Sequence, residues 1–89
     1  MREEKLVDPE NIIGSNIRRL RLKKKLGQTE LINQLQLKNI DITRETLVKI
    51  EGGRQHIKLS QLRGIRKVLE VSYEELLNDV VEINGTQEI

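Results

Sequence analysis

Apolar residues recur at intervals of three and four positions in four stretches of the chain. In order along the sequence these series are Ile13, Ile17 and Leu20; Leu31, Ile32 and Leu35; Leu47 and Ile50; and Leu62, Ile65 and Leu69. At about 100° per residue, each series lies on one face of an α-helix. The pattern therefore predicts an all-α fold with an aliphatic core, because Tyr73 is the only aromatic residue.

Residues that favour helix ends flank the first and second apolar series. Asp8 suits the cap of the first helix, and Pro9 suits its first position, where the missing N–H is not needed. Gly27 is expected to end this helix, so that the second begins at Gln28. Asn39 is the expected left-handed residue after the second helix.

The third helix, residues 43–52, has the clearest predicted boundaries. Thr43 is its expected N-cap, with the hydroxyl accepting from the N–H of Thr46. Gly53 suits the left-handed residue that ends a helix, because it has no Cβ to clash.

Two further features belong to the last predicted helices. Ser72-Tyr-Glu-Glu75 is a capping box that opens a fifth, short helix ending near Asn78. Gly64 lies in the fourth helix, on the side away from its apolar series. The pattern therefore gives Gly64 no packing role, although a helical glycine costs about 1 kcal/mol relative to alanine.

The third helix carries Arg44, Glu45, Val48 and Lys49 on the side opposite its apolar residues. Cationic donors can read guanine, a carboxylate can accept from cytosine, and methyl groups can contact thymine in a DNA major groove. The same residues also fit a short solvated helix. The helix dipole alone already favours a carboxylate in the first turn, as at Glu45.

Charge is strongly segregated along the chain. Residues 1–10 carry a net charge of −2, residues 11–69 of +10 and residues 70–89 of −6. A basic middle favours a polyanionic partner, and the acidic C-terminal end would be held away from that partner. Surface lysine and arginine are common on helices, so the segregation alone does not decide the function.

The composition argues against several classes of protein. The chain has no cysteine and one histidine, His56, so we expect no disulfide, no metal site and no cofactor. No set of residues suggests catalysis, and we expect no catalytic residue and no enzyme. No apolar run approaches the roughly 18 residues of a membrane span. The expected location is the cytoplasm, in association with the nucleoid.

The order of these features resembles the helix-turn-helix family of the phage repressors and Cro proteins, also called the xenobiotic-response-element (XRE) family. The resemblance covers about Ile13 to Leu77. It rests on Ile13-Gly14, Ile17-Arg18, Leu20-Arg21, Gln28 with Leu31, the run from Thr43 to Gly53, and Leu69-Glu-Val-Ser-Tyr-Glu-Glu-Leu-Leu77. It implies a five-helix, lambda-repressor-like DNA-binding domain with the helix-turn-helix at helices 2–3.

The resemblance also implies roles for individual residues. The implied DNA contacts are Gln28 to phosphate or a base, Arg44 and Glu45 to bases, Lys49 to a base or phosphate, Thr43 and Thr46 to the backbone, and a phosphate clamp made by the amides near Gly52 and Gly53 with the side chains of Arg54, Gln55 and His56. Arg21 and Glu51 occupy the places of the family's ion pair between the first and third helices. One departure is that Leu31 and Glu51 lie about five residues farther apart than is usual, so the second helix must be longer or the turn must be a loop.

The expected organisation is an N-terminal arm at residues 1–8, the helix-turn-helix domain at 9–79, and an acidic C-terminal tail at 80–89. The interpretation is a transcriptional regulator, expected to be a repressor, that binds double-stranded DNA as a homodimer. Leu76, Leu77, Val80, Val81 and Ile83 form the expected dimer interface. The alternative is an antitoxin or accessory regulator that acts through protein contacts made by its tail.

Overall fold

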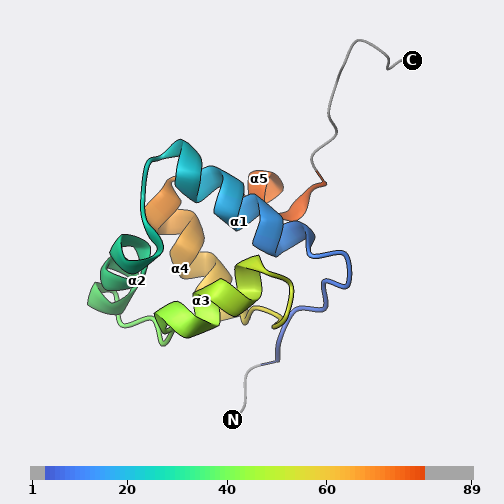
Figure 1. Cartoon of the computed structure of the whole chain (residues 1–89), viewed down its shortest axis with the longest axis horizontal. Helices are drawn as coiled ribbons and strands as arrows, with labels where there is room; N and C mark the ends of the chain where they lie inside the picture. The colour runs from blue at the N-terminus through green and yellow to red at the C-terminus, as the bar shows by residue number, and fades with distance from the viewer. Residues whose placement is uncertain (1–3, 80–89) are drawn as a thin grey trace.

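The computed structural model describes residues 4–79, and this part of the chain contains five helices and no strand. The helices are α1 (Ile12–Lys23), α2 (Gln28–Leu37), α3 (Arg44–Glu51), α4 (Leu59–Leu69) and α5 (Tyr73–Leu77). In Figure 1, α1 and α3 run above and below the centre of the molecule, with α2 to their left. The predicted all-α fold is confirmed, and no helix in residues 4–79 is long and apolar enough to cross a membrane.

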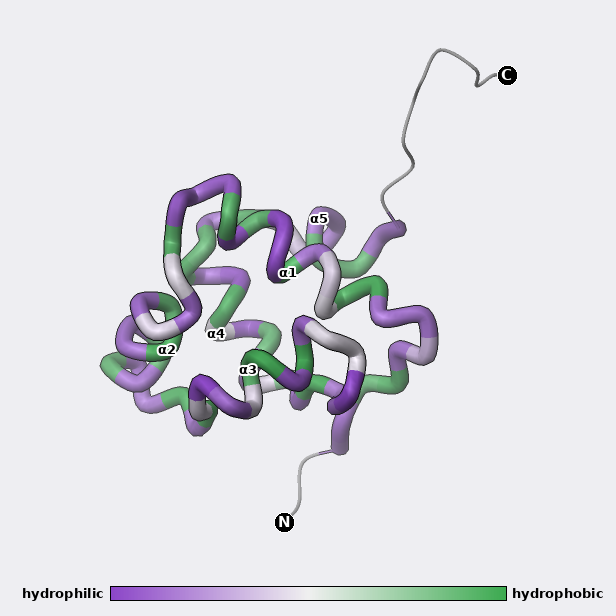
Figure 2. Tube along the Cα trace, viewed as in Figure 1, coloured by the Kyte–Doolittle hydropathy of each residue, from purple (hydrophilic) through white to green (hydrophobic). Residues whose placement is uncertain are grey.

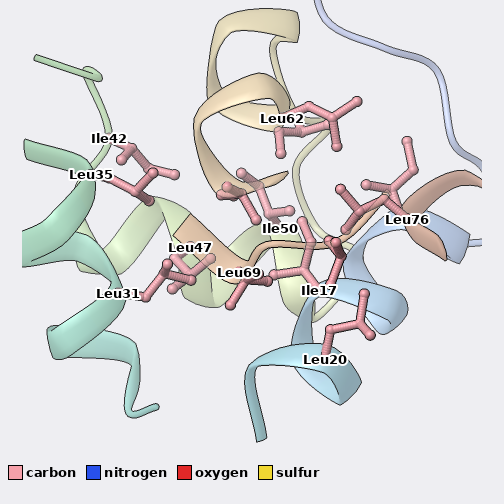
Figure 3. Close-up of a cluster of buried hydrophobic side chains, with 14 of the residues drawn as sticks. Ile17, Leu20, Leu31, Leu35, Ile42, Leu47, Ile50, Leu62, Leu69 and Leu76 are labelled. Atoms are coloured by element: carbon pink, nitrogen blue, oxygen red, sulfur yellow. The ribbon is translucent and has the colours of Figure 1, made fainter. Parts of the chain in front are cut away.

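The core lies where the apolar faces of α1, α2, α3 and α4 meet. Ile17, Leu31, Leu47 and Ile65, one from each helix, are fully buried. Figure 3 shows these faces converging, with Ile50 of α3 and Leu69 of α4 near the centre. Hydrophobic and hydrophilic segments alternate along each helix (Figure 2), as helical periodicity requires when one face is buried.

The first helix begins later than the sequence pattern predicts. Asp8 still caps it, but from one turn outside, because its carboxylate accepts from the N–H groups of Ile12 (2.9 Å) and Ile13 (2.7 Å). Pro9 lies in a turn closed by the Asn11 N–H and the Asp8 carbonyl, and is not the first helical residue. The cause is Asn11, whose left-handed backbone (φ 56°) separates this turn from the helix.

Gly27 does not end the first helix as expected, because α1 ends at Lys23, Lys25 (φ 60°) is the left-handed residue after it, and Gly27 (φ −77°) is the N-cap of α2. The helix ends predicted from Asn39, Thr43, Gly53 and Ser72 are confirmed. The Thr43 hydroxyl accepts from the Thr46 N–H at 3.1 Å, and the Ser72 hydroxyl accepts from the Glu75 N–H at 3.1 Å. Asn39 (φ 63°) and Gly53 (φ 78°) are both left-handed. Residues 38–43 therefore form the loop that connects α2 to α3.

Gly64 has a packing role, contrary to the expectation from the sequence. The residue is buried, and a Cβ added to it would lie 2.8 Å from Cγ1 of Ile40 and 3.1 Å from Cδ2 of Leu35. The apolar series of α4 did not predict that Gly64 contacts Ile40, because Ile40 lies in a connection without helical periodicity. Glycine thus lets the α2–α3 connection lie directly against α4.

The structure corrects part of the expected dimer interface. Leu76 is fully buried and belongs to the core, so it offers no surface to a second chain. It is the one buried residue of α5 and belongs to the same hydrophobic cluster as Ile17 and Leu20. Leu77 is 44% exposed and remains available. Val80, Val81 and Ile83, like the rest of the tail at 80–89, lie outside the described residues.

Candidate nucleic-acid interface

The outer face of α3 carries the side chains expected to read bases. Arg44, Glu45 and Lys49 are exposed, and Val48 is half-buried beside them. The opposite side of the helix is fixed in the core by Leu47 and Ile50, at 0% and 2% exposure. This arrangement presents two cations, a carboxylate and a methyl surface on one rigid element.

The N-terminus of α3 is held by a pair of threonines. The hydroxyls of Thr43 and Thr46 lie 3.0 Å apart and share a hydrogen bond, in addition to the Thr43 cap. Thr43 is exposed and Thr46 is half-buried. Thr43 uses its hydroxyl proton in the mutual bond, so a contact to a DNA phosphate would be donated by the Thr46 hydroxyl or would replace that bond.

Arg21 and Glu51 form a two-bond ion pair between α1 and α3. Arg21 donates from Nε to Glu51 Oε2 at 2.8 Å and from Nη2 to Oε1 at 2.9 Å. Its Nη1 donates to the Leu26 carbonyl at 2.8 Å. The residues are only 5% and 7% exposed, so the pair fixes the pose of α3 from beneath.

Gln28 begins α2 as expected, but its side chain turns toward the ion pair. Nε2 donates to Glu51 Oε1 at 3.1 Å, and the residue is half-buried. The amide thereby links the start of α2 to the end of α3. The expected phosphate contact would require Gln28 to release this bond or to donate the second N–H of its side-chain amide.

The backbone amides after α3 do not form the expected phosphate clamp. The N–H groups of Gly52, Gly53 and Arg54 donate to the carbonyls of Val48, Ile50 and Lys49 at 3.0, 3.1 and 2.8 Å. These bonds close the helix end, so the three amides are not free to bind an anion. Gly53 supplies the left-handed conformation that ends the helix, but its N–H is not available to a phosphate.

The side chains after this helix end remain available. Arg54 and His56 are exposed, and Gln55 is half-buried. His56 accepts from the Asp8 N–H through Nδ1 at 3.3 Å, which leaves Nε2 for another partner. The N-terminal segment adds support, because the Leu6 N–H donates to the Ile57 carbonyl at 2.7 Å.

Three polar residues that hold the helices and loops in place were not predicted from the sequence. Asn11 donates from Nδ2 to the Glu51 carbonyl at 3.1 Å, and Asn16 donates to the carbonyls of Leu76 (2.8 Å) and Asn78 (2.9 Å). Gln61 accepts from the Lys58 N–H and donates to the Asp41 carbonyl, each at 3.0 Å. For Asn16, the available signal was a polar residue three positions from Ile13 and four from Leu20, on the buried face.

Comparison with known protein families, curated proteins and solved structures finds no match for this chain. Within residues 4–79 no three histidine or acidic side chains gather as metal ligands.

Proposed function

We propose that this chain is a sequence-specific transcriptional regulator, a repressor that binds double-stranded DNA with α3 in the major groove. The observation that carries the proposal is the outer face of α3, where Arg44, Glu45 and Lys49 are exposed together on a helix whose other side is locked into the core. Base recognition needs such side chains on a rigid element.

Under this proposal, α2 and α3 form the helix-turn-helix, joined by the longer connection at residues 38–43. Two features support a fixed pose of α3 despite the extra length. The Arg21–Glu51 pair holds its C-terminal end against α1, and the Thr43 cap defines its N-terminal end. Arg44 and Lys49 then contact base edges, and Arg54 with His56 contacts the phosphate backbone.

A homodimer on a palindromic operator completes the proposal. One small domain reads few bases, and two-fold pairing would set half-sites about one helical turn, about 34 Å, apart. An apolar surface suited to such pairing surrounds Leu77, where Val7 (81% exposed), Pro9 and Ile12 line the same hollow. Val80, Val81 and Ile83, which lie outside the described residues, remain part of the proposed interface.

Selection from a randomised duplex pool at about 0.15 M salt tests the proposal, because non-specific binding is weak under this condition. The native chain should enrich an inverted repeat, and a chain with Arg44→Ala and Lys49→Ala should lose that enrichment while remaining folded by circular dichroism. If the folded native chain enriches no sequence, the DNA-reading proposal fails and the alternative of an antitoxin or accessory regulator takes its place.

A further inference from the structure

A groove with three cations lies between the α2–α3 connection and α4. Its lining residues are Lys38, Ile40, Ser60, Arg63, Gly64 and Lys67, and they surround a hollow of about 230 Å³. None of them belongs to α3 or to residues 54–56. The groove is therefore separate from the candidate DNA contacts.

The cations of this groove lack a counter-charge in the described structure. Lys38, Arg63 and Lys67 are exposed, and within residues 4–79 their side chains form no hydrogen bond or ion pair. No aspartate or glutamate lines the hollow. Three like charges around one depression repel each other, so a ligand with carboxylates would relieve this repulsion.

The floor of the groove is apolar. Ile40 is half-buried and lies against Gly64, where α4 has no side chain to separate the two. A nucleic-acid phosphate gains nothing from an aliphatic floor. A peptide that carries an aliphatic side chain between its acidic residues would bury that side chain against Ile40 and pair its carboxylates with the surrounding cations.

The groove is a built feature of this fold. The Ile40 N–H donates to the Leu35 carbonyl at 3.0 Å, and Gln61 of α4 donates to the Asp41 carbonyl at 3.0 Å. These two bonds fix the connection on both sides of Ile40. The hollow consequently has a defined shape before any ligand arrives, which lowers the entropic cost of binding.

We propose that this groove binds an acidic peptide segment with an aliphatic side chain, presented by a partner protein. Through this groove, another protein could pass a signal to the small helical domain that the structure describes. It does not depend on the proposed DNA binding, because the two sites share no residue.

Fluorescence anisotropy with the full chain tests the inference. The probe is a labelled twelve-residue peptide with a central leucine flanked by glutamates. We expect saturable binding with a Kd below about 1 mM, the range of weak transient contacts. The double variant Lys38→Glu with Lys67→Glu should weaken it by about tenfold or more, since two attractive pairs become repulsive.

Matched controls separate a specific groove from general charge. Arg18→Glu with Lys25→Glu makes the same change in net charge at exposed positions outside the groove, and should alter peptide affinity by less than about twofold. A probe with serine in place of the leucine should bind more weakly, and one with lysines in place of the glutamates should not bind.

Four results would overturn the inference. The first is no binding of the acidic probe, and the second is an equal loss of peptide affinity in the groove and control variants. The third is binding only of a peptide of residues 78–89, together with self-association of the chain. The fourth is a loss of duplex DNA affinity in the groove variant without any peptide binding. The third would assign the groove to a second copy, and the fourth would assign it to DNA. Peptide binding without any operator selection would leave the inference standing and reject the proposed function.

Discussion

At the scale of single residues, the contacts of Arg21 and Glu51 determine where α3 points. Three donors of the arginine are satisfied by Glu51 and the Leu26 carbonyl, and Gln28 adds a donor to the same carboxylate. Removing one partner leaves the other charged and out of water, which is more costly than removing both. The pair is therefore best tested by comparing single and double replacements.

Glu51→Ala should lower the free energy of unfolding by about 3–5 kcal/mol, because Arg21 is left buried without its carboxylate. Arg21→Met combined with Glu51→Leu should lower it much less. Urea unfolding monitored by circular dichroism measures both variants. A loss below about 1 kcal/mol for Glu51→Ala would mean that the pair is solvated like a surface salt bridge.

Arg44 and Arg54 should differ in what they contribute to DNA affinity. Arg44→Ala should lose about 1–3 kcal/mol on the preferred site and relax the preference at one base position. Arg54→Ala should weaken preferred and unrelated duplexes alike, and reduce the slope of log affinity against log salt by about one. Binding titrations at several salt concentrations distinguish them, and identical behaviour of the two variants would reject the base-reading role.

Residue exposure on α3 was predictable, whereas the hydrogen bonds at its end were not. The 100° periodicity of α3 correctly placed Arg44, Glu45 and Lys49 outside and Leu47 and Ile50 inside. The family resemblance implied that the amides near Gly52 and Gly53 would clamp a phosphate. In the structure those amides close the helix instead, and the choice between the two depends on the loop that follows.

At the scale of elements, α1 and α3 make backbone contact at Gly14. A Cβ added to Gly14 would collide with the Ile50 carbonyl oxygen and with Oδ1 of Asn11. The first of these atoms is helix backbone and cannot rotate away. Glycine at this position therefore sets how closely α3 approaches α1.

Gly14→Ala should consequently destabilise the fold by about 3 kcal/mol, at the upper end of the usual cost of overpacking. The neighbouring exposed Ser15→Ala should change the free energy of unfolding by less than about 0.5 kcal/mol. Thermal and urea unfolding of both variants give the comparison. If Gly14→Ala were as stable as the native chain, the close contact of α1 with α3 would be wrong.

The short helix α5 depends on its capping box. The Ser72 N–H donates to Glu75 Oε1 at 2.9 Å, and this hydrogen bond is the main cause that lowers the pKa of the Glu75 carboxyl below its ordinary value of 4.5. A lowered folded pKa contributes stability above the unfolded pKa, which is lost as the pH falls through the folded value. The affected range therefore lies below about pH 4.5.

Glu75→Gln tests this contribution, because glutamine keeps an acceptor for the Ser72 N–H but does not titrate. The native chain should be more stable than the variant at pH 6, and the difference should shrink as the pH falls below about 4.5. Urea unfolding of both chains across this range measures it. A difference that is constant with pH would mean that the Glu75 charge does not stabilise the cap.

Helix types and most helix ends were predictable from local residues, and the failures at Asn11 and Gly64 have non-local causes. Thr43, Gly53 and Ser72 act through neighbours within four positions, so the local sequence is enough to predict their roles. The start of α1 depends on Asn11, whose amide reaches the Glu51 carbonyl 40 positions away. The role of Gly64 depends on Ile40, which lies in a connection without periodicity.

At the scale of the whole molecule, the apolar surface around Leu77 is the remaining candidate for pairing two chains. Leu77 is 44% exposed and belongs to the surface, whereas its neighbour Leu76 is fully buried and belongs to the core. A homodimer on an inverted repeat gains affinity because the second half-site contact becomes intramolecular. Loss of pairing should therefore affect the full operator far more than a single half-site.

Leu77→Glu should yield a monomer in sedimentation at tens of micromolar. It should reduce affinity for the inverted repeat at least about tenfold and change affinity for one half-site less than about twofold. Its stability should stay close to native, whereas Leu76→Ala should lose about 2–5 kcal/mol because it leaves a cavity in the core. A Leu77→Glu chain that still sediments as a dimer would place the interface elsewhere. An unpaired chain with full operator affinity would instead mean that one domain reads the whole site, so the two-fold operator would have to be abandoned while the roles of Arg44 and Arg54 stood.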